Sequence, residues 1–300
     1  MSPGPRPVIV GLGEVLWDVF PDAAHFGGAP ANFACHAASL GAEAWVASAV
    51  GTDELGDRAL AALHEHRVEC GALARDPRHP TGTVTVQPAR GGQVHYTFAE
   101  DTAWDHLAWS TPMAALAERC DVVCFGTLAQ RSPASRETIQ RFLRATREPA
   151  WRVFDVNLRL QFYNAETVHT SLHMASVCKL NDDELPIVAR LCGLAVSEPR
   201  RVMVELAARF SLRLVALTRG AQGSLLWFDG VFDECPATPV DVVDSVGAGD
   251  SFTAALISDL WHGAPLPAAH RHASAVAAYV CSQKGATPPL PPHLRQLSTS

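Results

Sequence analysis

Small residues and acids gather in one late segment of this 300-residue chain. The stretch Asp241–Phe252 reads DVVDSVGAGDSF and is followed by a helix-forming sequence. Gly247 and Gly249 flank Ala248 there, and such small residues let backbone N–H groups converge at a helix N-terminus, where the dipole favours an anion. Asp250 falls in the first turn, where the same field holds an acid ionised, as suits a base that accepts a proton at neutral pH. A tight turn followed by an acid at a helix start explains the segment about equally well.

A glycine pair before a helix marks a second segment, near the start of the chain. Gly27 and Gly28 precede the alanine-rich run Pro30–Leu40, which has proline at its start. Glycine lets the backbone approach a ligand closely, and Asn32 adds a fixed donor and acceptor. A plain loop-to-helix junction explains these residues about as well.

Polar or glycine-rich loops follow five of the expected strands. Ligands of open α/β sheets bind at the carboxyl ends of the strands, so a row of such loops indicates a site at one sheet edge. Glu14 and Asp18 follow the first strand, Val8–Leu12, where a carboxylate can hold sugar hydroxyls. Asn181 and Glu184 offer oxygen ligands for water-mediated magnesium, although a helix N-cap with its capping glutamate is a rival interpretation. The other loops are Asp155–Arg159, Thr218–Gly223 and the segment before Asp250.

An alternation of strands and helices positions these loops. The expected strands are Val8–Leu12, Trp45–Val50, Asp121–Gly126, Trp151–Val156, Val177–Leu180, Arg213–Thr218, Ser224–Phe228 and Val231–Cys235. The expected helices are Pro30–Leu40, Asp53–His66, Pro133–Arg147, Ala165–Ala175, Asp183–Leu191, Glu198–Phe210, Ala248–His262 and Pro267–Lys284. This alternation predicts a mostly parallel sheet with helices on both faces.

One hairpin breaks the alternation. Thr83–Gln87 and Gln93–Phe98 alternate polar and apolar residues, and Arg90, Gly91 and Gly92 lie between them. Such a pattern predicts two paired strands with one wet face. We expect a small sheet that projects from the main body as a lid.

The charge and the scarcity of lysine exclude several function classes. The chain has 24 Lys and Arg against 31 Asp and Glu, a formal charge of −7, which argues against a nucleic-acid binder. Lys179 and Lys284 are the only lysines, and neither follows a glycine, so no G-x-x-x-x-G-K phosphate loop exists. Any phosphate chemistry must therefore use backbone amides, arginine or metal. The eight cysteines are scattered without a C-x-x-C pair, and we expect them to be reduced.

Neither a membrane span nor a signal peptide is expected. The sequence has no run of 18 or more apolar residues, and Met1–Pro7 lacks the apolar core of a leader. We expect a soluble cytoplasmic protein that binds no membrane.

Several motifs together resemble the ribokinase/PfkB family of carbohydrate kinases. Gly27–Asn32 (GGAPAN) and Asp244–Asp250 (DSVGAGD) are similar to the family's two motifs in order and separation. Asp155–Arg159, Lys179–Glu184 and Thr218–Gly223 resemble its internal landmarks, and the likeness covers roughly residues 8 to 290. It implies one ribokinase-like domain over residues 1–300, doubly wound, with a β lid contributed mainly by about 14–28 and 82–104.

The resemblance also implies an ATP-dependent sugar kinase and a role for each motif residue. Asp250 would take the proton from the sugar hydroxyl, and the amides of Gly247, Ala248 and Gly249 would bind the transferring phosphoryl group. The residues implied to hold the sugar are Asp18, Gly27, Gly28, Asn32 and Arg159. Those implied for the nucleotide are Asn181, Thr218, Gly220, Gly223 and Gly249. Asn181 and Glu184 would bind Mg²⁺ through water, and Asp244 and Gly285 would bind a monovalent cation such as K⁺.

Three short stretches favour fructose as the substrate. Gly13–Asp18, Ala103–Asp105 and Phe125–Arg131 resemble fructokinases, which implies phosphoryl transfer from ATP to a primary hydroxyl of fructose. Ribose, a nucleoside and 2-keto-3-deoxygluconate are alternative substrates, and a catalytically inactive sugar or nucleotide sensor is an alternative function. A dinucleotide oxidoreductase is disfavoured, because Gly11-Leu-Gly13 lacks the third glycine of G-x-G-x-x-G. A homodimer through the exposed lid strands is a further expectation.

Overall fold

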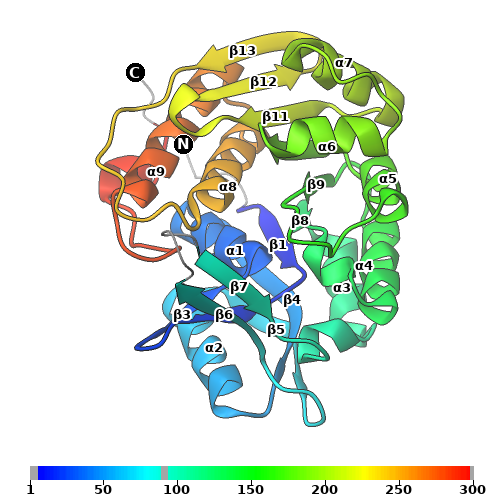
Figure 1. Ribbon diagram of the computed structural model, residues 1–300, viewed down its shortest axis with the longest axis vertical. Coiled ribbons are helices and arrows are strands. Elements are labelled where there is room, and N and C mark those ends of the chain that lie inside the picture. Colours follow the sequence, from blue (N-terminus) through cyan, green and yellow to red (C-terminus); the bar gives the residue numbers. More distant parts are fainter. Residues whose placement is uncertain (1–5, 89–93, 298–300) are drawn as a thin grey trace.

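β1 (Val8–Leu12) forms as expected and lies within a nine-stranded sheet of order β13-β12-β11-β10-β9-β8-β1-β4-β5 (Figure 1). The structure, a computed structural model, describes residues 6–88 and 94–297. The other strands of this sheet are β4 (Glu43–Gly51), β5 (Glu69–Asp76), β8 (Val122–Phe125), β9 (Trp151–Asp155), β10 (Val177–Asn181), β11 (Leu214–Thr218), β12 (Ser224–Phe228) and β13 (Val231–Cys235). β12 and β13 form an antiparallel hairpin at one edge, and the remaining strands run parallel.

Helices cover both faces of this sheet because its strands carry apolar residues on both sides. In β1, Val10 and Leu12 enter one buried cluster while Ile9 enters the other. The first cluster is covered by α3 (Thr111–Arg119), α4 (Pro133–Ala145), α5 (Ala165–Met174), α6 (Glu184–Leu191) and α7 (Pro199–Phe210). The second is covered by α1 (Ala29–Ser39), α2 (Glu54–Glu65), α8 (Ala248–Trp261) and α9 (Leu266–Cys281). Figure 1 shows the two helix layers on opposite sides of the sheet.

A separate four-stranded sheet has the order β3-β2-β6-β7. Its strands are β2 (Leu16–Val19), β3 (Ala24–Gly27), β6 (Gly82–Pro88) and β7 (Val94–Phe98). β2 and β6 run parallel, and the outer pairs are antiparallel. The doubly wound sheet and the small additional sheet are therefore confirmed.

Two of the three stretches that resemble fructokinases, Ala103–Asp105 and Phe125–Arg131, meet at the base of the small sheet. Arg131 donates to both carboxylate oxygens of Asp105 at 2.7 Å and to the carbonyl oxygen of Ala99 at 2.6 Å. Its guanidinium also lies 4.0 Å from the centre of a Trp104 ring. These contacts fix the segment that leaves β7, which includes the 3-10 turn Ala103–His106.

Two elements were missed by the sequence analysis, β5 and α3, whereas β2 and β3 lie within the range 14–28 that the family resemblance implied for the lid. β5, with the sequence ECGALARD, mixes charged and small residues, and its parallel pairing with β4 shifts register between Trp45 and Ala47. Its sequence therefore lacks the apolar run or the polar–apolar alternation by which a strand is predicted. The turn Arg90–Gly92 lies outside the described residues. Within residues 6–88 and 94–297, no helix is long and apolar enough to cross a membrane.

Candidate active site

The carboxyl ends of the parallel strands, the small sheet and the N-termini of α1 and α8 enclose a cleft of about 670 Å³. Most of the predicted site residues line it: Asp18, Gly28, Asn32, Arg159, Asn181, Thr218, Asp244, Gly247, Gly249, Asp250 and Gly285. Among the described residues, five predicted ones are not part of the lining: Gly27, Glu184, Gly220, Gly223 and Ala248. The two motifs meet here although they lie far apart in sequence.

The N-terminus of α8 opens into the cleft. Gly247 precedes the helix with φ 78°, and a Cβ there would lie 2.1 Å from the carbonyl oxygen of Ala286. Only glycine fits this left-handed, crowded position. The first-turn N–H groups of a helix have no acceptor within it, and the amide of Ser251 is the first to bond back, to Gly247 at 2.9 Å. The amides of Gly249 and Asp250 therefore remain available to an anion.

Asp250 projects from this first turn toward α1. Asn32 donates to its Oδ2 at 2.9 Å, a contact between residues 218 positions apart. Burial raises the pKa of Asp250 to about 6, and the charge of Asp155 adds to the effect, while Lys179 and the Asn32 hydrogen bond oppose it. The expectation that the helix field dominates is thus incorrect, because removal from water outweighs it. The carboxylate still loses most of its protons by pH 7.

A buried ion pair lies beneath the same turn. Nζ of Lys179 is 3.1 Å from both carboxylate oxygens of Asp155. Burial lowers the pKa of Lys179, but the charges of Asp155, Glu184 and Asp250 outweigh it and hold that pKa above its ordinary value. A Cβ on Gly249 would lie 2.9 Å from this Nζ. The ammonium group thus adds positive charge directly below the free amides of α8.

Lys179 was not among the predicted site residues. The sequence did carry a signal: it is a lone charge in the short apolar strand β10, 7% exposed. A lysine is rarely buried without a partner, so an acid on a neighbouring strand is required. Asp155 on β9 is that acid, since the two residues are direct register partners.

Glu14 is a further acid of the cleft that the motif residues did not include. It follows β1, is 2% exposed, and burial raises its pKa to about 7. Its Oε2 has no hydrogen-bond partner among the described residues. Its carbonyl oxygen lies 2.5 Å from where a Cβ on Gly28 would be, so glycine at φ 107° is required at the start of α1. Burial also raises the pKa of Asp18, on β2.

Asn181 and Glu184 bond reciprocally at the start of α6, in the pattern of a cap and its capping glutamate that the rival interpretation described. It accepts from the amide of Asn181 at 2.9 Å, while Asn181 Oδ1 accepts from the amide of Glu184 at 2.9 Å. Its other oxygen accepts from the amide of Leu158 at 2.8 Å. Glu184 therefore joins the loops after β9 and β10, and the Asn181 side chain, not Glu184, faces the cleft.

Two glycines predicted to bind the nucleotide, Gly220 and Gly223, do not line the cleft. Gly223 has φ 82°, and a Cβ there would lie 2.1 Å from the carbonyl oxygen of Cys235, so it allows the turn into β12 to pack on β13. A Cβ on Gly220 would meet open space. Thr218, at the end of β11, is the residue of this loop that lines the cleft.

The loop that packs against Gly247 is held by α1. His36 lies one turn after Asn32, and its Nε2 donates to the carbonyl oxygen of Ala286 at 2.9 Å. Burial lowers the pKa of His36 to about 4, so the ring is neutral near pH 7. Asp244 Oδ2 accepts from the amide of Gly285 at 3.1 Å, which brings together the two residues expected at a cation site.

Comparison with known proteins identifies the family. The profile of the pfkB family carbohydrate kinases matches residues 18–293. The chain belongs to this family. A fructokinase of Salmonella typhimurium is 30% identical over 261 residues, covering 83% of both chains. This protein is therefore a carbohydrate kinase of the pfkB family.

Two solved kinases share the fold. A fructokinase from Vibrio cholerae O395, solved with fructose, ADP and calcium, superposes with a TM-score of 0.80 at 25% identity, covering 95% of this chain and 96% of the other. An aminoimidazole riboside kinase from Salmonella enterica, solved with its riboside and an ATP analogue, gives 0.78 at 25% identity with the same coverage. Structures with this fold therefore include one with bound fructose and one with a bound riboside.

Proposed function

We propose that this pfkB kinase transfers the γ-phosphoryl group of ATP to a primary hydroxyl of fructose. The observation that carries the proposal is the position of Asp250, a partly buried carboxylate with a pKa of about 6 at the N-terminus of α8. Asp250 accepts a hydrogen bond from Asn32 and lines the same cleft as the small sheet and the loop 244–247. The fructokinase relative at 30% identity supports fructose.

In the proposed reaction, different groups of the protein act on the proton and on the transferring phosphoryl group. Asp250 accepts the proton of the hydroxyl while the hydroxyl oxygen bonds to the γ-phosphorus and the bond to the β–γ bridging oxygen breaks, releasing ADP. The amides of Gly249 and Asp250 stabilise the phosphoryl oxygens, with Gly247 and Ala248 shaping the turn. The Lys179 ammonium adds to this field. Asn32 holds the Asp250 carboxylate toward the sugar.

The cleft divides into a sugar half and a nucleotide half. Asp18, Gly28, Asn32 and Arg159 would hold sugar hydroxyls, and Gly27 would shape the strand end beside them. Thr218 and Asn181 would contact the nucleotide. Closure of the small sheet as a lid would exclude water and limit ATP hydrolysis. The lid strands contribute Val84, Val86, Tyr96 and Phe98 to the lining.

Metal ions would act in the nucleotide half. Asn181 lines the cleft with Glu184 behind it, and its Oδ1 keeps a second lone pair besides the one that accepts from the Glu184 amide. Such oxygen donors would suit Mg²⁺ held through water and substrate phosphates, where the ion would neutralise phosphate charge. The loop around Asp244 and Gly285 would bind K⁺. Replacing KCl by tetramethylammonium chloride should then lower kcat, and an unchanged rate would remove K⁺ from the proposal.

A nucleoside is the second candidate substrate, supported by the riboside kinase likeness. A coupled ADP-release assay with fructose, ribose, adenosine, aminoimidazole riboside and 2-keto-3-deoxygluconate separates the candidates. Highest kcat/KM on fructose supports the proposal, and highest kcat/KM on a riboside replaces it. Retained ATP binding without turnover on any of these compounds would favour a sensor.

A homodimer through the small sheet belongs to the same proposal. β3 and β7 are the outer strands of that sheet, and Tyr96 on β7 is 48% exposed. Open strand edges invite pairing between copies. Light scattering at micromolar protein should give twice the chain mass, and a monomer mass would refute the dimer.

A further inference from the structure

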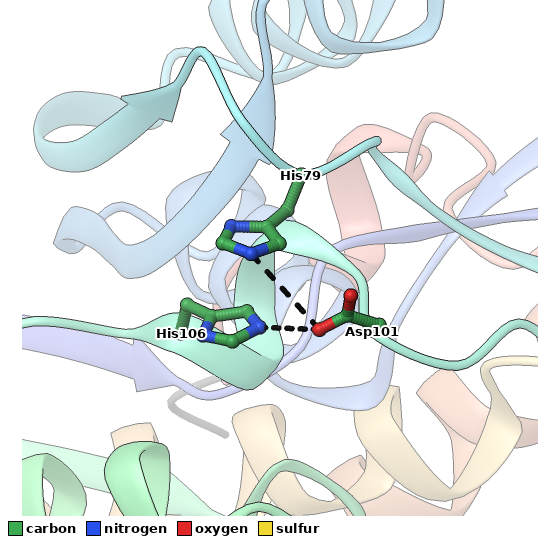
Figure 2. Close-up of side chains that lie close together, drawn as sticks. All are labelled: His79, Asp101 and His106. Carbon is green, nitrogen blue, oxygen red and sulfur yellow. Dashed lines mark hydrogen bonds and ion pairs between the residues drawn. The ribbon is translucent and has the colours of Figure 1, made fainter.

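Three metal-ligand side chains meet at the base of the small sheet, outside the cleft. His79 lies on the segment between β5 and β6, which enters the small sheet. Asp101 and His106 lie on the segment that leaves β7. Figure 2 shows the two imidazole rings one above the other, with Asp101 beside both. The ring centres are 3.6 Å apart, and ligand atoms of all three residues lie within 4.8 Å of one another.

We propose that His79, Asp101 and His106 bind one divalent transition-metal ion, of which Zn²⁺ is the best fit. Two imidazoles and one carboxylate suit Zn²⁺ and its neighbours, whereas Mg²⁺ and Ca²⁺ prefer sets of oxygen ligands. Three protein ligands with water in the fourth position make an open tetrahedral zinc site. The exposure of Asp101 leaves that fourth position accessible, since its side chain is 77% exposed.

The donor distances are close to those that such an ion requires. Asp101 Oδ1 lies 2.6 Å from Nε2 of His106 and 4.0 Å from Nε2 of His79. Bonds near 2.0–2.1 Å in a tetrahedron separate neighbouring donors by roughly 3.3 Å, a value between these two distances. The two rings are only 10° from parallel, so metal binding requires them to tilt until both Nε2 lone pairs point at one ion, while the exposed Asp101 side chain rotates toward it.

A second carboxylate already orients one ligand. Asp76 Oδ2 lies 2.7 Å from Nδ1 of His79, and Asp76 Oδ1 accepts from the amide of Arg78 at 2.8 Å. Nδ1 of His79 therefore carries the proton and Nε2 faces the proposed site with its lone pair. Metal-binding histidines characteristically donate their second nitrogen to such a carboxylate. Asp76 is thus a positioning residue for the site.

The ion would fasten the two connections of the small sheet to each other. They already share a hydrogen bond from the amide of Ala103 to the carbonyl oxygen of Pro80 at 2.8 Å. Asp53 holds the incoming segment through the amide and hydroxyl of Thr81, at 2.8 and 2.6 Å. The bound metal adds a cross-link from His79 to His106 at the point about which a moving sheet would pivot.

The test is a zinc titration of metal-stripped, tag-free full-length protein against a chromophoric chelator, followed by Co²⁺ absorption. We expect one equivalent of Zn²⁺ to bind with micromolar or tighter affinity, and Co²⁺ to give tetrahedral d–d bands. His79→Ala and His106→Ala should each weaken binding at least ~10-fold, and Asp76→Asn should weaken it by about 10-fold or more. Zn²⁺ should also raise the melting temperature of the unaltered protein but not of these variants.

The matched control is the double variant His169→Ala/His173→Ala. These residues form a second close histidine pair, one turn apart on α5 with ring centres 4.6 Å apart, and within residues 6–88 and 94–297 no carboxylate pairs with either ring. Zinc binding that survives in this control and fails in His106→Ala supports the site. The proposal would be overturned if the protein bound no stoichiometric Zn²⁺ at ~10 µM, or if the His79 and His106 variants bound Zn²⁺ as tightly as the unaltered protein. Only an ion pair at Asp101 would then remain. The readouts do not depend on kinase activity, so failure here is separate from failure of the proposed reaction.

Discussion

Replacing Lys179 by methionine tests the buried ion pair beneath the anion-binding turn. The side chains of Lys179 and Asp155 are only 9% and 5% exposed, so the substitution leaves a buried carboxylate without its partner. Removing one member of such a pair costs about 3–5 kcal/mol of unfolding free energy. Lys179 also lowers the pKa of Asp250 while Asp155 raises it. The variant should therefore lose stability, and the acid limb of its kcat/KM profile should move above pH 6.

Urea unfolding followed by tryptophan fluorescence measures the first effect, and the pH profile measures the second. Arg201→Met is the control, because the Arg201–Glu205 pair is exposed on α7 and such pairs contribute about 0–1 kcal/mol. Adding Asp155→Asn to Lys179→Met removes the unpaired charge. The double variant should recover much of the lost stability and return the acid limb toward pH 6. Its kcat should remain below that of the unaltered protein, because the Lys179 ammonium group is still missing beneath the amides of α8. A Lys179→Met protein as stable as Arg201→Met, or an unmoved acid limb, would refute the reasoning.

Three other substitutions follow from the same geometry. Asp250→Asn should stabilise the protein at pH 8 by up to about 3 kcal/mol, because a pKa raised from 3.8 to about 6 means that folding penalises the ionised carboxylate. This gain in unfolding free energy should shrink as pH falls from 6 to 4. A difference in urea unfolding that does not depend on pH would count against the prediction. Gly28→Ala should abolish activity and cost more stability than Gly41→Ala, since both positions have positive φ but only Gly28 meets a neighbour, at 2.5 Å; equal losses would contradict the crowding argument. His36→Leu should cost about 1–3 kcal/mol by leaving the Ala286 carbonyl without its donor. Because His36 binds its proton only in the unfolded state between pH 6.5 and about 4, the unaltered protein should lose stability through that contribution as pH falls across this window, and the variant should lack it.

Patterns within one segment predicted much of the fold. β1 and β12 form with the expected bounds because their apolar runs end at glycine or at a turn, and β13 does so because it follows the Asp229-Gly230 turn. β5 and α3 were missed because Glu69–Asp76 has no clear apolar period and Thr111–Arg119 is short with proline in its first turn. The alternation of elements is a local property, so it can be read without knowing which strands pair.

The candidate site required contacts between distant segments. Asp250, Asn32 and the glycine turns could be picked from their own motifs, but the Asn32–Asp250 hydrogen bond joins residues 218 apart. Glu14 and His36 act through burial, which depends on the packing of α1 against β1 and on the loop at Ala286. Sequence spacing carries no information on such desolvation. For the same reason the helix-field argument alone misjudged the direction of the Asp250 pKa shift.

The central claim is that Asp250 is the base for phosphoryl transfer in this pfkB kinase. The most direct test is kcat/KM for the best sugar from pH 5 to 8, with Asp250→Asn beside the unaltered protein. We expect activity to rise through a pKa near 6 as Asp250 loses its proton, and kcat of the asparagine variant to fall by ~10²-fold or more with ATP binding retained. A variant that keeps more than about a tenth of the activity, or a rate independent of pH across this range, would contradict the account.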